Sequence, residues 1–208
     1  MAGSSPAMTR NENVIEELDD PFAQAQRKAP DGRWSHNRDR AFDPAALAQQ
    51  RHCRDTAMLS DPGTARFITP DGVAITTEIG GWRNAAVISG HWALYGFGMF
   101  AVEEKSSGRY IGRVGPWCPP GWPGFEVGWG IARECRGKGY AVEAARASID
   151  WVFATFEIEE IIHCIESVNV PSQGVARRLG ARREGEVDLS GKINERWVTS
   201  RRAWAGQN

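Results

Sequence analysis

Residues that could bind an anion gather in one short stretch of the chain. In ECRGKGYAVEAAR, residues 134–146, Arg136 and Lys138 alternate with Gly137 and Gly139 directly before a helical pattern. The start of a helix has unpaired backbone N–H groups and about half a unit of positive charge, and glycine lets backbone approach a ligand closely. The stretch therefore predicts a phosphate or pyrophosphate cradle. The alternative is a solvated connection between a strand and a helix that merely needs glycines.

Two better-known phosphate loops do not fit this stretch. A P-loop needs Ser or Thr after its Gly-Lys pair and a glycine five residues before that pair. Here Gly139 follows the lysine and Ala132 holds the earlier place. A dinucleotide fingerprint needs a small residue where Val142 stands. The letters GFGMFA (96–101) match that fingerprint, but they open a strand rather than a helix, so we treat the match as chance.

A second candidate for chemistry is Glu126, which lies in the strand-like stretch FEVGWGIA, residues 125–132. A carboxylate in an apolar strand beside a cleft has a raised pKa, which suits a general base. The alternative is that Glu126 points to solvent, as most carboxylates on strands do.

Gly128 and Gly130, in the same stretch, indicate a β-bulge or a close approach of another chain segment. Where glycines open a strand, its N–H and C=O groups become available to a ligand. We therefore nominate the main chain of Trp129, Gly130 and Ile131 as a binding surface; a bulge without any ligand is the alternative.

The stretch NVPSQGVARRLGA, residues 169–181, places Asn169 and Ser172 at the start of a short helix. Asn and Ser favour helix starts simply as caps, so these two residues could be structural. His163 lies on an apolar strand and is predicted to be a hydrogen-bonded core residue. His91 is also more consistent with packing than with catalysis.

Composition limits the other classes of function. The formal net charge is −1 over 208 residues, which favours neither nucleic acid nor a membrane surface as a partner. No apolar run approaches the ~20 residues of a membrane span, and MAGSSPAMTR does not resemble a signal peptide. The four cysteines form no CxxC pair, so we expect no metal site and a cytoplasmic location. The sequence is compatible with a homodimer.

The elements that must position these residues follow from the hydrophobic periods. We read residues 1–44 as a polar, flexible extension and residues 45–205 as a single domain. Segment 116–124, PWCPPGWPG, is expected to be irregular because it holds four prolines. Helices are expected at 45–61, 75–96, 141–156 and 171–180, and strands at 97–104, 109–115, 125–132, 160–166, 181–189 and 192–204. This order predicts a mixed α+β fold with a largely antiparallel sheet.

Several of these stretches resemble the motifs of a known family. Arg136-x-x-Gly139-x-Ala141 matches the Q/R-x-x-G-x-G/A loop of the GNAT superfamily of N-acetyltransferases. NVPSQGVARRLGA is similar to the N-x-x-S segment, closed by a glycine, of a branch resembling ribosomal-protein N-terminal acetyltransferases. GHWALYGFGMFAVEEKSSGRYIGRVG and GWPGFEVGWGIA also resemble that branch, and the resemblance covers residues 55–187.

The resemblance implies a fold, a cofactor and a reaction. The fold would have a splayed parallel strand pair at the cofactor site and helices on both faces of the sheet. The cofactor would be acetyl-CoA, and acetyl would pass to a primary amine by direct attack in a ternary complex. Glu126 would be the base and Ser172 a weak acid. The cofactor would be bound by the β-strand main chain named above, by Asn169 and Ser172, and by Arg136, Gly137, Lys138, Gly139, Tyr140 and Ala141.

The proline-rich segment is the candidate substrate wall. Trp117 and Trp122 could shape an apolar pocket there, although an aromatic-capped surface loop is equally consistent with the letters. The chain also departs from the family in two ways. The usual first strand is not recognisable in residues 1–52, and Ala176 stands where many members carry a tyrosine that protonates the thiolate. These departures keep open a CoA-binding sensor without transferase activity; a phosphate-binding module that does not bind CoA is a third reading.

Overall fold

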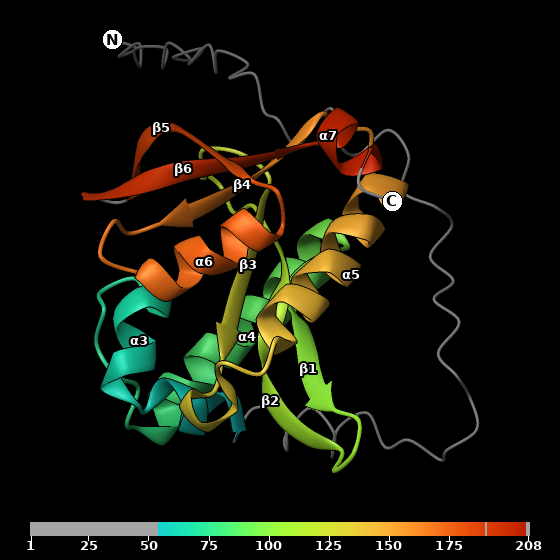
Figure 1. The fold of residues 1–208 in the computed structure, drawn as a ribbon. Coiled ribbons are helices and arrows are strands. Elements are labelled where there is room, and N and C mark those ends of the chain that lie inside the picture. Colours follow the sequence, from blue (N-terminus) through green and yellow to red (C-terminus); the bar gives the residue numbers. More distant parts are fainter. Residues whose placement is uncertain (1–53, 190, 207–208) are drawn as a thin grey trace, which may run out of the picture.

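A computed structural model describes residues 54–189 and 191–206 (Figure 1). The predicted extension, 1–44, and any strand within 1–52 lie outside the described residues. Of the helix expected at 45–61, residues 54–59 are described and are helical.

The centre of the fold is a six-stranded sheet in the order β1-β2-β3-β4-β6-β5. Every neighbouring pair is antiparallel except β3 and β4, which are parallel. The mixed, largely antiparallel sheet predicted from the sequence is therefore confirmed. The strands are β1 (Phe100–Glu104), β2 (Arg109–Trp117), β3 (Glu126–Ile131), β4 (Glu160–Ile165), β5 (Arg182–Leu189) and β6 (Lys192–Ser200).

Helices pack on both faces of the sheet at β3. Val127 and Ile131 share a buried cluster with Ile149 of the long helix α5. Gly130 faces the other way, because a Cβ built on it would lie 2.5 Å from Ile68 Cδ1 of α3. None of the helices in the described part of the chain is long and apolar enough to cross a membrane. The helices are α3 (Pro62–Ile68), α4 (Glu78–Tyr95), α5 (Tyr140–Thr155), α6 (Val170–Arg178) and α7 (Arg201–Ala205), with a 3-10 turn, η2 (Arg133–Cys135).

The prediction that segment 116–124 is irregular is wrong at its first two residues. Pro116 and Trp117 continue β2 and pair with β3. Proline is tolerated there because β1 pairs with β2 only as far as Val114, so the missing N–H removes no ladder hydrogen bond on that side.

The sequence missed helix α3 and placed the end of the last strand too late. The helix expected at 45–61 does end before Pro62, but Pro62 then begins α3, where its missing N–H costs nothing. The last strand was expected to run to residue 204, but it ends at Ser200, whose side chain accepts a hydrogen bond from Ala203 N–H and starts α7. This turn buries Trp204 in the main core.

Candidate active site

Strands β3 and β4 meet only at their beginnings. Within the described residues they are paired at Glu126 and Ile162 alone, and Ile162 N–H donates to Phe125 C=O at 2.9 Å. Beyond that point the two strands diverge toward their carboxyl ends, as Figure 1 shows for β3 and β4. The splayed parallel pair implied by the family resemblance is therefore present.

Side chains replace the ladder where the strands part. Cys164 N–H of β4 donates to Glu126 Oε1 at 3.0 Å, and His163 Nδ1 lies 2.7 Å from Val127 C=O. A carbonyl can only accept, so Nδ1 holds the proton, and Nε2 accepts from Thr199 Oγ1 at 3.0 Å. Burial lowers the pKa of His163 to about 4. His163 is thus a neutral, hydrogen-bonded core residue, as the sequence predicts.

Glu126 is buried, with 8% of its surface exposed, and does not point to solvent. Its Oε1 receives the Cys164 N–H, and its Oε2 receives the indole N–H of Trp122 at 2.6 Å. Burial raises the pKa of Glu126 to about 7, against the opposing effect of these two hydrogen bonds. A carboxyl group with this pKa can accept or release a proton near neutral pH.

Strand β3 contains no bulge against β2, because the register between them runs without a shift. The glycines instead permit close approach, which was the other reading of the sequence. A Cβ on Gly130 would come within 2.5 Å of Ile68, and one on Gly128 within 3.0 Å of Met99 Cε. The ends of these two side chains would have to shift if either glycine carried a Cβ.

The register also decides which main-chain groups of β3 face the splay, the opening between β3 and β4. Val127 C=O is directed to β4, whereas Ala132 N–H donates to β2 at 2.8 Å. Since backbone groups alternate along a strand, those of Trp129 and Ile131 face the splay. The main chain of Gly130, nominated with them, faces β2 instead.

The loop before α5 is open. Gly137 and Gly139 have φ of 78° and 89°, in the left-handed region that favours glycine. A Cβ on either would meet no atom of the described chain within 4 Å. Gly139 is the N-cap of α5 and, as a glycine, supplies no side-chain acceptor to the first N–H groups of the helix. This arrangement fits a pyrophosphate.

Arg136 is anchored to two other segments of the chain. Its Nε donates to Ile131 C=O at 3.0 Å, and its Nη2 donates to Thr64 Oγ1 of α3 at 2.5 Å. Tyr140 is also anchored, because its hydroxyl donates to Glu104 Oε1 of β1 at 2.7 Å. Lys138 and Arg136 are both exposed, so both can meet an anion at the loop.

Helix α6 is joined to β3 at the mouth of the splay. Asn169 caps the helix by accepting Ser172 N–H at 3.3 Å, and the indole N–H of Trp129 donates to Ser172 Oγ at 3.2 Å. The stretches FEVGWGIA and NVPSQGVARRLGA, both singled out from the sequence, thus meet at this hydrogen bond. Ala176 lies one turn after Ser172 and is fully buried in a cluster with Ile165.

The two tryptophans of the predicted substrate wall have different surroundings. Trp117 stacks on the His91 ring at 4.3 Å between centroids, and burial lowers the pKa of His91. His91 is held by Phe97 C=O at 2.7 Å and by Cys118 N–H at 3.3 Å, so it is a packed residue. Trp122 lies at Glu126 instead.

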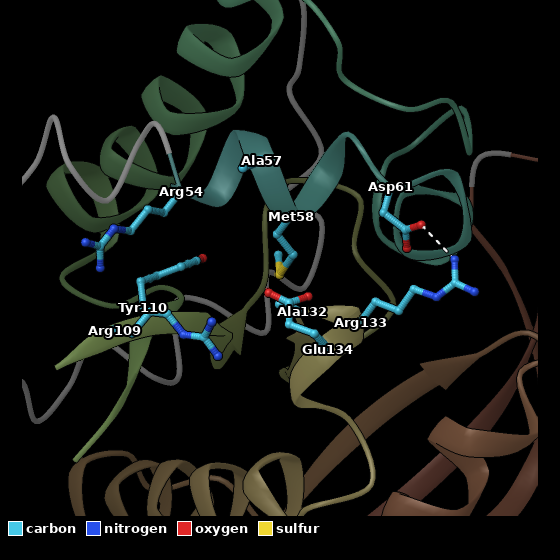
Figure 2. Close-up of a pocket in the computed structure, with 9 residues that line it drawn as sticks. All are labelled: Arg54, Ala57, Met58, Asp61, Arg109, Tyr110, Ala132, Arg133 and Glu134. Atoms are coloured by element: carbon cyan, nitrogen blue, oxygen red, sulfur yellow. Dashed lines mark ion pairs between the residues drawn. The ribbon is translucent and has the colours of Figure 1, made fainter. Parts of the chain in front are cut away.

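A pocket of about 310 Å³, which the sequence did not reveal, borders the η2 turn that precedes the glycine loop (Figure 2). It lies between helix 54–59, the start of β2 and the η2 turn. Arg133 and Asp61 face each other across one side of it at 3.5 Å. Its other lining residues come from segments far apart in the sequence, which is why no local pattern predicts it: Arg54, Ala57, Met58, Arg109, Tyr110, Ala132 and Glu134.

Solved structures share this architecture. An acetyltransferase from Agrobacterium tumefaciens is 24% identical with a TM-score of 0.60, and the match covers 78% of this chain and 89% of that one. The aminoglycoside acetyltransferase AAC(6')-Ib in complex with coenzyme A is 16% identical with a TM-score of 0.64, covering 76% and 94%. At these identities the likeness shows the fold.

Curated relatives match shorter segments. YnaD of Bacillus subtilis, described as an uncharacterized N-acetyltransferase, is 38% identical over 29% of this chain and 36% of its own length. YkkB of the same organism, described as uncharacterized, is 33% identical over 41% of this chain and 51% of its own length. The chain thus spans about half, or less, of the relatives it matches. The family of the acetyltransferase (GNAT) domain matches residues 46–182, and the chain belongs to this family.

Proposed function

We propose that the protein transfers the acetyl group of acetyl-CoA to a primary amine, by direct attack in a ternary complex. One observation carries this proposal: strands β3 and β4 part after Glu126 and open toward a glycine loop and the uncapped start of α5. The opening would offer an extended ligand the main-chain groups of β3 that β4 leaves unpaired, and the loop would offer a place for its anionic part.

The chain's own groups would hold the cofactor at three points. The loop N–H groups from Gly137 to Ala141 and the ammonium of Lys138 would take the pyrophosphate, and the Asn169 side chain would bind along the α6 edge. AAC(6')-Ib, which shares the fold, binds coenzyme A. When bound, acetyl-CoA supplies an activated acetyl thioester.

Positioning and polarisation would come from β3. The N–H groups of Trp129 and Ile131 face the splay, so either can donate to the thioester oxygen, where negative charge develops during attack. Because a rigid strand holds these donors, they need no rearrangement during the reaction. Holding amine and thioester in line supplies much of the rate.

Proton transfer would be divided between two residues. Glu126 would accept the proton that the amine must lose, which its pKa of about 7 permits at neutral pH. The leaving thiolate needs little help, since thiols have a pKa near 8.5. Ser172 Oγ accepts the Trp129 indole N–H, so the hydroxyl proton can be directed at the sulfur. Ala176 has no proton to give.

The acceptor is an amine on a protein N-terminus, an amino acid or a small molecule. The resemblance to ribosomal-protein N-terminal acetyltransferases supports the first, and the fold shared with an aminoglycoside acetyltransferase supports the last. The cytoplasm is the compartment we propose for this reaction. The second candidate function, a CoA-binding sensor, is favoured by Ala176, which removes the usual acid.

A panel of amines, each mixed with acetyl-CoA and the protein, distinguishes the two functions. The panel contains peptides with free N-termini, amino acids and aminoglycosides, and thiol release is followed with time. Amine-dependent thiol release, with acetylated product seen by mass spectrometry, supports the enzyme. Binding of CoA without release for any amine supports the sensor.

Arg136→Ala should destabilise the protein more than it weakens CoA binding. The side chain joins the loop to Ile131 C=O and Thr64, and losing these bonds should cost about 1–3 kcal/mol of unfolding free energy. Arg136→Lys should not restore them, because only a guanidinium presents both donors at once. Thermal melting and CoA titration test this. Unchanged melting with a large loss of affinity would show that Arg136 binds the phosphate directly.

A further inference from the structure

Trp122 links the proline-rich segment to the buried carboxylate of β3. Its indole N–H, which can only donate, lies 2.6 Å from Glu126 Oε2. The tryptophan itself is half-buried and packs against the main core. The backbone N–H of Trp122 donates to Pro119 C=O at 3.0 Å and closes a turn, so the backbone that carries the indole is fixed. The sequence suggested a wall residue, whereas the contact suggests a role in chemistry.

We propose that Trp122 is a positioning residue, which holds the Glu126 carboxylate by its indole N–H in the orientation needed to take the proton of the amine. This inference rests on the proposed function, in which Glu126 is the base. It adds that the base is set by the segment we assigned to the substrate wall. That segment would therefore connect acceptor binding to proton transfer.

The geometry supports this role because each carboxylate oxygen is held from a different element. Cys164 N–H of β4 holds Oε1, and the Trp122 indole holds Oε2. Together they fix the plane of the carboxylate. Both donors favour the ionised form, which burial alone would disfavour. Without the indole, Glu126 would be a more weakly oriented and more weakly acidic group.

The other titratable groups near Glu126 do not change their protonation near neutral pH. The Cys164 thiol faces it from β4, and its pKa is raised, first by burial and then by the charge of Glu126. Arg196 of β6 has the opposite, smaller effect on that thiol. His163 is neutral above its pKa of about 4. On β2, Trp117 pairs with Glu126 and does not titrate.

The test is the pH profile of kcat/KM for Trp122→Phe, which keeps an aromatic ring and removes the N–H. The low-pH limb should move up by about one pH unit, because one hydrogen bond to a charged group and one pKa unit are of similar free energy. Trp204→Phe is the matched control, since it removes another indole–carboxylate bond, 2.7 Å to Asp150 Oδ1. Its profile should match that of the wild type.

Trp122→His keeps a ring N–H and should shift the limb less than phenylalanine does. An equal shift in both variants would show that ring packing, and not the hydrogen bond, controls Glu126, and would overturn the proposal. So would a limb that moves in neither variant.

A second readout separates this proposal from the proposed function. Carbon NMR of labelled glutamate, assigned with Glu126→Gln, follows the ionisation of Glu126 without any substrate. We expect its titration to move up in Trp122→Phe by the same amount as the kinetic limb. A titration that does not move overturns the positioning role. A titration that moves while the kinetic limb stays would keep the indole's hold on Glu126 and overturn Glu126 as the base.

Discussion

Gly139→Val should greatly weaken CoA binding while the protein stays folded. The φ of Gly139 is +89°, and a Cβ there would project into open space where the pyrophosphate is expected. A Cβ at this position meets no described atom within 4 Å, so we expect the substitution to leave the core intact. It does block the N–H groups at the start of α5. Losing two charge-assisted hydrogen bonds should weaken CoA by about 100-fold or more, measured by calorimetric titration.

Backbone strain needs its own control, because valine is strained at positive φ anywhere. Gly191→Val provides it: Gly191 has φ of +86°, also meets no described atom within 4 Å, and lies in the β5–β6 turn. Both variants should lose a similar stability, roughly 1–3 kcal/mol. Only Gly139→Val should lose affinity for CoA. Equal affinity in the two variants would mean that the loop does not bind the cofactor.

Glu126→Gln should lower kcat/KM by about 10²–10⁴-fold, the usual contribution of a positioned base. The variant should also lose the fall in kcat/KM below a pH of about 7, which we assign to protonation of Glu126. CoA affinity should be unchanged, because Glu126 does not lie in the loop. Near-full activity with the wild-type pH profile would show that this carboxylate is structural.

Glutamine also introduces a structural problem, which a double variant resolves. Both Glu126 oxygens accept N–H groups, from Cys164 and Trp122. A glutamine amide can satisfy one of these donors, and its NH₂ must then face the other. Trp122→Phe combined with Glu126→Gln removes this donor–donor contact. The double variant should recover stability lost by Glu126→Gln alone but should recover no activity.

The pH dependence of stability provides a check without substrate. The pKa of Glu126 is raised from 4.5 to about 7, so its stabilising contribution is complete below pH 4.5 and is lost as pH rises to about 7. His163 acts oppositely: its pKa is lowered from 6.5 to about 4, so its contribution is lost as pH falls from 6.5 to 4. As pH rises from 4.5 to 7, the melting temperature of Glu126→Gln should therefore increase relative to that of the wild type, because only the wild type loses the Glu126 contribution.

Local patterns predicted the elements well, because helix and strand periods depend on neighbouring residues. The strand–loop–helix unit around Gly139 and the cap at Asn169 are of this kind. Glu126 could be nominated for the same reason: it is a carboxylate in an otherwise apolar strand.

Contacts between distant segments could not be predicted in this way. Arg136 bonds Thr64 across 72 residues, so a residue nominated as a phosphate ligand also braces the loop against α3. His163 holds Val127 across 36 residues and so helps to keep the strands apart. Pro116 sits in a strand only because its neighbour β1 has already ended. Each outcome depends on tertiary packing, which cannot be predicted from a residue's type and local spacing.

The most direct test of the central claim is thermal melting of the wild-type protein with CoA, acetyl-CoA and ATP in turn. A ligand that binds the folded state alone stabilises it by about 2.7 kcal/mol at 100 times its Kd. We predict that CoA and acetyl-CoA raise the Tm, that ATP raises it less, and that Gly139→Val responds to none of them. No increase with CoA at millimolar concentration, or a larger increase with ATP, would contradict an acetyl-CoA site at this loop.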